Sequence, residues 1–308
     1  MAIYPSNPSN RDKAFALMRP ALQAAGRDRN LVLAGLSPQA SSALHKHMRE
    51  QELAEGAVLW DAGGHPSDIF FPHSGMISIR VPSKEGHAIE VATIGRESAA
   101  GAYDGSSMLA PVTQAIVQIP GRLAVISAQA FAAAAQESDE IRRIPRACRG
   151  WPMLQAQLLA ACNAVHSADA RFCRWLLRAS DALAADVVPA TQETIAQALG
   201  VRRTTATLIA QHLQLRGAIS YSRGRITIRD RAALQTAACD CYSFLARRHW
   251  PCELLGGDSR LAAGDGLTLL AGTAHSPAAA QAFDVIPGPR PSGAEPRTHL
   301  RQESRKGG

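Results

Sequence analysis

The chain has 308 residues, of which 46% are hydrophobic and 19% are charged, with a formal net charge of +7. This length and composition are typical of a globular protein with two modest domains and tails, and they argue against an intrinsically disordered chain. No apolar run approaches the roughly 20 residues that a membrane span needs, and residues 1–10 lack the basic and apolar stretches of a secretory signal. We therefore expect a cytoplasmic protein without a membrane partner.

The positive charge gathers in one segment of the chain. Residues 31–130 contain six Lys or Arg and nine Asp or Glu, a net charge of −3, whereas residues 171–231 contain ten Arg and four acidic residues, a net charge of +6. Residues 253–308 contain six residues of each sign. A surface that binds phosphates needs such a local excess, although a solvated basic face would show it equally well on charge alone.

The first 130 residues predict an extension followed by a β domain. Residues 1–29 are expected to be loosely ordered, with a weak helical stretch at residues 13–25. A short helix is predicted from Ser37 to Arg49, because Ser37 can cap it and Pro38 suits its first turn. Short apolar or alternating runs punctuated by glycines then predict antiparallel strands. These runs are Ala57 to Trp60, Ile69 to Phe71, Met76 to Val81, Ala88 to Ile94, Thr113 to Ile119 and Arg122 to Ile126.

A helical period takes over after residue 130. Pro145 and Pro152 each remove a backbone donor, so we expect a break or kink at both positions, with a dimer interface that starts near Met153. Beyond them a narrow apolar stripe predicts either intramolecular core or a seam between two helices. Its members are Leu154, Leu158, Ala161 and Val165. Asp169 is a candidate cap for the next helix.

The stretch from Thr191 to Gly217 predicts a helix-turn-helix. Ala196 must be small because the second helix crosses close to it, and Gly200 suits the left-handed conformation that ends the first helix. Val201 plugs the turn. The expected inner faces of the two helices are Ile195, Ala196 and Leu199, and then Ala206, Ile209 and Leu213. A helical hairpin with a polar rim is the alternative, but it would not need this register of small residue, glycine and apolar plug.

Hydrogen-bond donors occupy the outward face near the start of the second helix. They are Arg202, Arg203, Thr204, Thr205 and Thr207. Arginine bonds guanine bidentately, threonine bonds a phosphate or packs its methyl group on thymine, and a helix N-terminus favours phosphate. We expect the two arginines to reach bases and the three threonines to tune base or phosphate contacts.

Residues 218–228 predict a two-stranded hairpin that turns at Arg223-Gly224-Arg225. A basic hairpin directly after a recognition helix is a wing, and Arg223 and Arg225 would hold the sugar-phosphate backbone, which fixes register and supplies affinity. The helix-turn-helix, the wing and the local charge together predict sequence-specific binding to double-stranded DNA. After Ser243 no apolar period persists, and residues 246–308 read as a disordered tail.

A β domain, a linking helix and a winged helix in this order resemble the Crp/Fnr family of bacterial transcription regulators over about residues 29–245. Residues 56–63 and 68–75, Gly95-Arg96-Glu97 and the winged helix carry the resemblance. It implies an α+β fold with an N-terminal antiparallel β-roll that senses an effector, a long linking and dimerisation helix, and a C-terminal winged helix-turn-helix. It also implies a homodimer on a near-palindromic operator, with recognition helices roughly 34 Å apart, and RNA polymerase as a partner.

The chain accordingly divides into five parts. They are an extension at residues 1–29, a cyclic-nucleotide-binding-like β-roll sensor domain at 30–130, a linking and dimerisation helix region at 131–168, a winged helix-turn-helix domain at 169–245 and a tail at 246–308.

The family's phosphate cassette is only partly matched. Gly95, Arg96 and Glu97 keep a version of its first part, but Thr113 stands where the resemblance implies an arginine that pairs with the cyclic phosphate. Loss of that charge removes the strongest contact to the phosphate, so these four residues are candidates for an effector other than cAMP. In the recognition helix Arg203 matches the family's commonest base-reading arginine, whereas Thr204 and Leu208 replace a glutamate and a second arginine. The operator is therefore expected to differ.

The six cysteines are too few and too scattered for a disulfide scaffold, and none precedes Cys148, which argues against an iron–sulfur sensor. Two groups of possible metal ligands occur along the chain, and four ligands with the spacing of the second group could hold zinc. The groups are Cys162 with His166, and Cys239 and Cys241 with His249 and Cys252. The Cys-x-Cys spacing is unusual for a zinc site, so we expect inert thiols and no metal. His73 and His87 lie in turns and give no haem site, so no cofactor is predicted.

No serine–histidine–aspartate order, paired carboxylates or phosphate-cradling loop indicates catalysis, and we expect no enzyme activity. Two alternatives stay open. One is a ligand-binding β-roll protein whose helical part contacts a protein partner. The other is a cupin-like enzyme, for which His65, His73 and His87 do not have the spacing of converging metal ligands.

Overall fold

The computed structural model describes residues 30–84, 88–102 and 111–246, all of which belong to one compact unit, Tyr4–Leu269. The expected N-terminal extension with its weak helix, and the expected tail after residue 246, lie outside the described residues. Within these ranges, no helix is long and apolar enough to cross a membrane.

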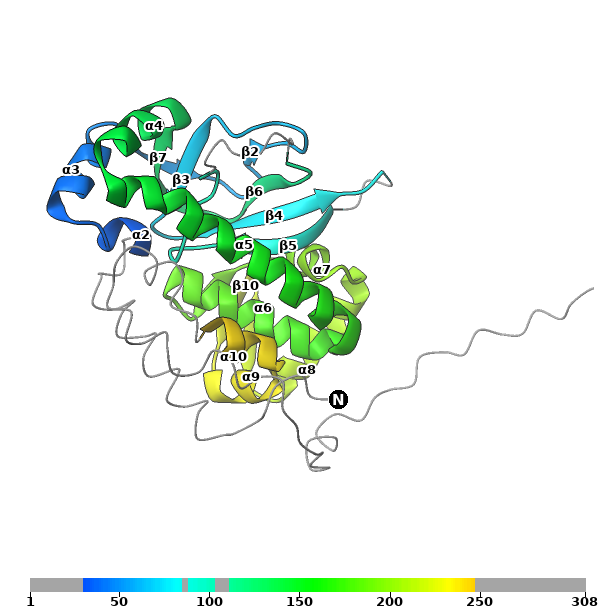
Figure 1. The fold of residues 1–308 in the computed structure, drawn as a ribbon. Coiled ribbons are helices and arrows are strands. Elements are labelled where there is room, and N and C mark those ends of the chain that lie inside the picture. The colour runs from blue at the N-terminus through cyan, green and yellow to red at the C-terminus, as the bar shows by residue number, and fades with distance from the viewer. Residues whose placement is uncertain (1–29, 85–87, 103–110, 247–308) are drawn as a thin grey trace, which may run out of the picture. The chain divides into compact units, whose positions relative to one another are not determined.

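Two antiparallel sheets form the N-terminal part, as the sequence predicts (Figure 1). Their strand orders are β1-β7-β3 and β2-β6-β4-β5. The strands are β1 (Arg49–Leu53), β2 (Val58–Trp60), β3 (Asp68–Pro72), β4 (Met76–Pro82), β5 (Ala88–Ile94), β6 (Gln114–Ile119) and β7 (Gly121–Ser127). All six predicted runs are strands. Strand β1 was not predicted, because its sequence REQEL is charged and largely exposed, as suits the edge of a sheet.

Strand β7 shows how the two sheets build their core. Leu123 and Val125 face the second sheet and join a cluster with Ile77, whereas Ala124 and Ile126 face the helices on the other side. Alternate residues of a strand point to opposite faces, so β7 is buried on both. The helices on that outer face are α2 (Leu31–Ala34), α3 (Pro38–His45) and α4 (Ala128–Glu137). Ser37 caps α3 through a bond from the Ala40 amide, as expected.

The linking helix α5 (Asp139–Val165) runs without interruption through both prolines. The expectation of a break at Pro145 and Pro152 is therefore wrong. A proline inside a helix costs about 3 kcal/mol through its missing N–H and its ring. Here that cost is offset by burial along the same helix, because Ile144 and Trp151 are at most 1% exposed and α5 packs on β5.

The predicted apolar stripe of α5 divides between inside and outside. Leu158 is buried and Leu154 packs against the same cluster, whereas Ala161 and Val165 are exposed. The outward face of the helix carries Met153, which is 59% exposed, and three further residues that follow it at helical spacing. They are Gln157, Ala160 and Ala164.

The C-terminal part begins with α6 (Ala168–Leu183), whose cap is Ser167 rather than the expected Asp169, which lies in the first turn. The remaining elements are β8 (Val187–Pro189), α7 (Gln192–Leu199), α8 (Arg203–Leu215), β9 (Ile219–Ser222), β10 (Arg225–Ile228), α9 (Arg231–Ala237) and α10 (Asp240–Ala246). The order of the elements from α6 to β10 is that of a winged helix, and the mixture of antiparallel sheets and helices confirms the α+β class.

A buried carboxyl lies on the sheet of the β domain. Glu90 of β5 is only 4% exposed, and the Ser78 hydroxyl donates to its Oε2 over 2.8 Å. Burial raises the pKa of Glu90 to about 7, although this hydrogen bond and the nearby positive charges of Arg174 and Arg80 act in the opposite direction. The folded protein therefore binds the Glu90 proton more tightly than the unfolded chain does.

Because the pKa of Glu90 is raised on folding, its protonation favours the folded state below about pH 4.5, and this contribution is lost as the pH rises to about 7. We predict that Glu90→Gln increases the free energy of unfolding at pH 8 by up to about 3 kcal/mol and changes it little at pH 4.5. Urea unfolding at both pH values measures this difference. Glu137→Gln on the exposed end of α4 is the matched control, and an equal effect of Glu90→Gln at both pH values contradicts the prediction.

Candidate nucleic-acid interface

The helix-turn-helix forms as the sequence predicts. Thr191 caps α7 by accepting a hydrogen bond from the Thr194 amide over 3.0 Å. Gly200 ends the helix with a φ of 63°, in the left-handed region that glycine enters without steric penalty. The amides of Gly200 and Val201 return to the carbonyls of Gln197 and Ala196, which closes the helix end and starts the turn into α8.

Helix α8 packs on this turn through a narrow buried stripe, which consists of Ala206, Ile209, Ala210 and Leu213. Arg202 is its N-cap residue and Arg203 its first helical residue, and both side chains are exposed. Thr204 is also exposed, one turn before Leu208, which is 64% exposed. The exposed face of α8 therefore combines arginines at its start with a threonine and a leucine further along.

Thr205 and Thr207 are partly buried rather than fully outward. The Thr207 hydroxyl donates to Gln192 Oε1 over 2.7 Å and lies 3.0 Å from the Arg203 carbonyl oxygen. It therefore links α8 to the first turn of α7. Gln192 had no predicted role, and only its position at the start of α7, directly after the cap, could have suggested one.

The wing is a hairpin of β9 and β10 that turns at Arg223 and Gly224, with φ values of 46° and 74°. Two consecutive positive φ values are the signature of the tight turn that matches the twist of a hairpin. Arg223 and Arg225 are both exposed. The structure adds a third strand, β8, which pairs Pro189 with Arg225 and was not predicted.

The tip of the wing and the start of α8 both lie beside the start of α7. A Cβ atom added to Gly224 would come within 3.6 Å of Thr191 Cγ2, and Thr207 bonds Gln192 in the same turn. The segment 171–231 contains ten arginines. Six of them are exposed, namely Arg202, Arg203, Arg216, Arg223, Arg225 and Arg229. Arg174 and Arg178 are instead buried, so the excess charge is presented by α8 and the wing.

The candidate effector residues have a different setting from the one expected. Glu97 is 8% exposed, and its Oε1 accepts hydrogen bonds from the Gly95 amide, Trp151 Nε1 and Arg178 Nη2 over 3.2, 3.1 and 2.9 Å. The Arg178 guanidinium also lies 5.5 Å from the centre of the Trp151 ring. Burial disfavours the guanidinium's charge, but the carboxylates of Glu97 and Asp181 outweigh this effect and raise the pKa of Arg178. Glu97 therefore joins the β domain to α5 and α6.

Gly95 has a packing reason to be glycine. A Cβ atom there would lie 2.7 Å from Glu97 Oε2 and 3.0 Å from Ala182 Cβ on α6. Arg96 is 1% exposed, and its carbonyl accepts a hydrogen bond from the Leu31 amide. All three residues of this segment thus contribute to the interior.

Thr113 lies at the other end of the sheet from these residues. Gly95 follows Ile94, which pairs with Ile77 near one end of β4, whereas Thr113 precedes Gln114, which pairs with Arg80 near the other end. These two residue pairs lie about 10 Å apart along β4, given a rise of about 3.3 Å per residue. The structure therefore does not bring the four candidate effector residues together. Thr113 instead accepts a hydrogen bond from Trp60 Nε1 at its carbonyl oxygen.

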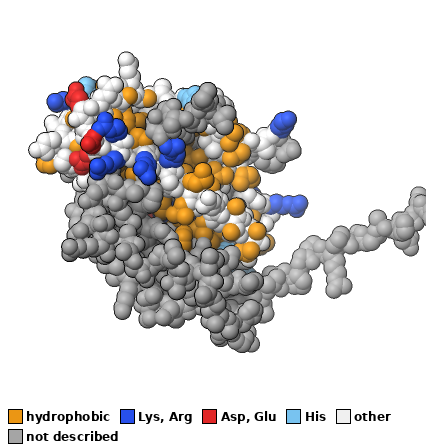
Figure 2. Space-filling view, viewed as in Figure 1, with side chains coloured by type: hydrophobic (Ala, Val, Ile, Leu, Met, Phe, Trp, Pro, Cys, Tyr) orange, Lys and Arg blue, Asp and Glu red, His pale blue; other side chains and the backbone are white. Residues whose placement is uncertain are grey.

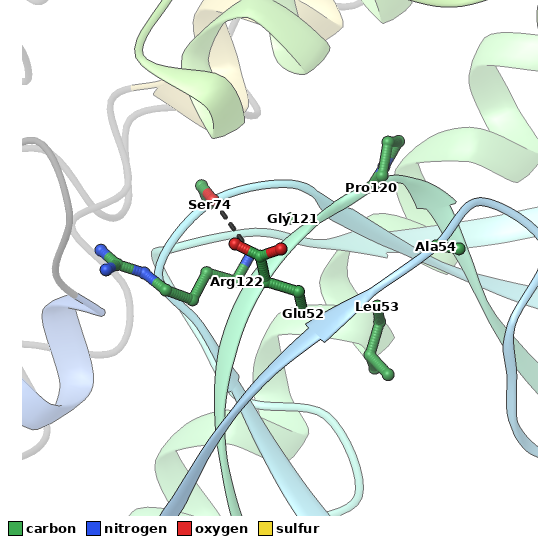
Figure 3. A pocket seen from close by; sticks show the side chains of 7 residues that line it. All are labelled: Glu52, Leu53, Ala54, Ser74, Pro120, Gly121 and Arg122. Carbon is green, nitrogen blue, oxygen red and sulfur yellow. Dashed lines mark hydrogen bonds between the residues drawn. The ribbon is translucent and has the colours of Figure 1, made fainter.

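A shallow pocket of about 630 Å³ lies elsewhere, between the end of β1, the turn from β3 to β4 and the start of β7 (Figure 3). Its lining residues are Glu52, Leu53, Ala54, Ser74, Pro120, Gly121 and Arg122. The Arg122 amide donates to the Ser74 hydroxyl, and a Cβ atom at Gly121 would lie only 2.3 Å from the Ser74 carbonyl oxygen. None of the candidate effector residues lines this pocket.

The Glu97 contacts generate a stability prediction. Removing one partner of a buried ion pair leaves an uncompensated charge, so Glu97→Gln should lower the free energy of unfolding by about 3 kcal/mol. Urea unfolding at neutral pH measures the loss. Glu52→Gln, which removes an exposed carboxylate of β1, should change it by less than about 1 kcal/mol. Equal effects of the two substitutions would show that the buried pair contributes nothing.

Residues 170–237 match the family model of the Crp-like helix-turn-helix domain. No curated protein matches the chain in sequence. Among solved structures, FixK2 from Bradyrhizobium japonicum has a TM-score of 0.53 at 15% identity, with 62% of this chain and 97% of that chain covered. The c-di-GMP responsive global regulator CLP of Xanthomonas campestris has a TM-score of 0.51 at 14% identity, with 62% and 99% covered.

A putative transcriptional regulator of the Crp/Fnr family from Eubacterium rectale also matches, at 19% identity and a TM-score of 0.48, with 66% of this chain and 94% of that chain covered. The family model identifies the helix-turn-helix domain, and the likeness to FixK2 and CLP extends the shared fold to the β domain. Residues 170–237 therefore form a Crp-like helix-turn-helix domain, and the chain shares its fold with FixK2 and CLP.

Proposed function

We propose that the chain binds a near-palindromic DNA site as a homodimer and regulates transcription from it. The observation that carries this proposal is the meeting of three elements around Thr191 and Gln192, where the first turn of α7, the start of α8 and the tip of the wing are neighbours. Exposed arginines flank this point on α8 and on the wing. A DNA backbone laid across it would meet positive charge on both sides.

The roles of the individual residues follow from their exposure. Arg202 and Arg203 at the start of α8 would reach base edges in the major groove, and Thr204 would contact a base or a phosphate. Arg223 and Arg225 on the wing would hold the sugar-phosphate backbone. These roles are supported by the exposure of all five side chains.

Thr205 and Thr207 are less free to act on DNA directly. The bond from the Thr207 hydroxyl to Gln192 favours a role in holding α8 against α7, with only the methyl group available to a base. Leu208 is the more exposed neighbour on the outward side, and its apolar side chain would pack on a thymine methyl group. A leucine here cannot read guanine as an arginine would, which supports an operator unlike that of family members with two arginines.

The homodimer is supported by the outward face of α5. Met153, Ala160 and Ala164 are exposed and share this face, and hydrophobic side chains gather over the C-terminal half of α5 in Figure 2. Basic side chains gather over its N-terminal half, where Arg146 and Arg149 are exposed. Two parallel copies would bring these arginines together, so the seam would begin near Met153, on electrostatic grounds rather than because of the prolines.

The effector is proposed not to be cAMP. Glu97 already accepts three internal hydrogen bonds, and the register of β4, β5 and β6 separates Gly95 from Thr113. A cyclic phosphate would therefore find neither a free carboxylate nor an arginine at the matched positions. As a regulator that acts on DNA, the homodimer would work in the cytoplasm and affect RNA polymerase at the promoter.

Arg203 gives the direct test of DNA reading. Selection from random duplex DNA with the full chain should enrich a near-palindrome, and Arg203→Ala should weaken binding to it by roughly 1–3 kcal/mol while relaxing discrimination at one position of each half-site. Arg49→Ala, an exposed arginine on β1, is the matched control and should leave affinity unchanged. Selection that returns no enriched palindrome contradicts the proposal.

Ala160 gives the test of the dimer. Ala160→Glu places a carboxylate in the proposed seam, where it would lose hydration without a partner, so we predict at least a roughly 100-fold weaker dimer. Sedimentation equilibrium measures the association constant. Ala132→Glu, on an exposed position of α4, is the matched control and should remain dimeric. A monomeric wild-type chain, or equal behaviour of both variants, contradicts a seam on this face of α5.

A further inference from the structure

Four side chains of the kind that bind metals meet where the end of α5 lies against α10. Cys162 and His166 come from the last turn and the cap of α5, Cys239 directly precedes α10, and Cys241 lies in its first turn. One potential ligand atom from each residue lies within 4.8 Å of each of the others. The two halves of the group are more than 70 residues apart in the chain and are brought together only by the fold.

The spacing within the group suits a single tetrahedral ion. Cys162 Sγ lies 3.6 Å from Cys239 Sγ, and Cys241 Sγ lies 3.6 Å from His166 Nδ1. Bonds of about 2.3 Å to sulfur and about 2.0–2.1 Å to nitrogen at tetrahedral angles separate the ligand atoms by roughly 3.5–3.8 Å. The sulfurs are too far apart for a disulfide, which needs about 2.05 Å. An iron–sulfur cluster would hold its thiolates farther apart than this group allows, because several irons lie between them.

The surroundings also suit a buried metal–thiolate group. Cys162, Cys239 and Cys241 are at most 7% exposed, and His166 is half-buried. Three thiolates with Zn²⁺ carry one net negative charge, and Arg174 supplies a buried positive charge that acts on both Cys162 and Cys239. In the described part of the chain, Arg174 Nε has no hydrogen-bond partner, and the Arg174 charge also acts on Glu90 of β5.

The protein holds both halves of the group in place through its own contacts. The His166 amide donates to the Cys162 carbonyl over 3.0 Å, which fixes the two α5 residues on one side of the helix end. On the other half, the Tyr242 hydroxyl donates to Asp181 Oδ2 over 2.9 Å and so anchors α10 on α6. Such outer contacts orient metal ligands before the metal binds.

We propose that Cys162, His166, Cys239 and Cys241 bind one zinc ion in a closed tetrahedral Cys₃His site. Each thiol gives its proton to solvent as its sulfur binds the ion. Four protein ligands leave no open position, so the site is structural and ties α10, which follows the wing, to the end of α5. This proposal departs from the expectation of inert thiols. Of the six side chains that the sequence suggested for a metal, His249 and Cys252 lie outside the described residues.

The test uses the full chain, purified under reducing conditions, with metal content measured by mass spectrometry. We expect about one zinc per chain, a rise in the unfolding temperature when zinc is added after chelation, and the visible absorption of a tetrahedral thiolate site when cobalt replaces zinc. Cys241→Ala and His166→Ala should each weaken zinc binding by more than roughly 10-fold. Loss of a residue that only supports a ligand already weakens metal binding by at least roughly 10-fold, and loss of a ligand itself should weaken it more. Cys148→Ala, which removes another buried cysteine of α5, is the matched control and should retain the metal.

Cobalt absorption of the wild-type chain decides the matter even where a variant does not fold. The proposal is overturned by a chain that binds no zinc after reduction and reconstitution, or by zinc binding that survives Cys241→Ala undiminished. It is equally overturned by iron with inorganic sulfide in place of zinc, or by a Cys162–Cys239 disulfide in peptide mapping of the protein as isolated. Failure here leaves DNA binding by α8 and the wing intact, because none of the four ligands lies in those elements.

Discussion

Glu97 places a carboxylate where the segment after β5, the middle of α5 and the middle of α6 meet, and three N–H donors converge on its Oε1. A buried carboxylate is tolerated only when it is paired and hydrogen-bonded, and Arg178 with Trp151 meets both needs. Each donor comes from a different element. The pair therefore fixes how α6, the first helix of the winged domain, lies on the β domain. Later elements pack on α6 in turn, namely β8, α7, α8, α9 and α10.

A second set of polar contacts orients α7 on the same β domain. The Thr194 hydroxyl donates to Glu55 Oε1 over 3.0 Å, and Gln118 Nε2 donates to the Thr194 carbonyl over 3.3 Å. Thr194 lies one turn from the cap at Thr191, beside which the wing and the start of α8 meet. These contacts with the β domain thus lie only a few residues from the point where α7, α8 and the wing meet. Hydrophobic packing continues across this boundary, because Met76 and Ile119 share a cluster with α6 and α7.

Local sequence sufficed for the elements whose chemistry is local. Gly200, Ala196 and the apolar plug predict the helix-turn-helix because a left-handed turn and a close crossing demand those residues at that spacing. The exposure of the arginines at the start of the second helix follows from their position on that helix. The strand β1 escaped prediction because an edge strand can be charged on both faces. The linking helix was predicted, but its uninterrupted course was not, because tertiary packing outweighs two prolines.

Long-range pairing explains the other differences. Glu97 looked like a ligand of an effector because nothing near it in the sequence announces Arg178, which lies 81 residues away. The thiols looked inert for the same reason, since Cys239 and Cys241 meet Cys162 and His166 only in the folded chain, where the proposed zinc site would form. In both cases the residue types indicate what chemistry the side chains can perform. Their partners are distant in sequence, so only the folded structure identifies them.

The helix α5 could carry these long-range contacts and the proposed dimer seam on different sides. At 100° per residue, Trp151, Gln155 and Cys162 share one side, which bonds Glu97, Thr93 and the thiol group in turn. Met153, Ala160 and Ala164 lie on the opposite side. A seam between two copies of α5 would therefore bury apolar surface without disturbing any of the three internal ties. In such a dimer, each protomer would present α8 at an angle set by its own pair of Glu97 and Arg178.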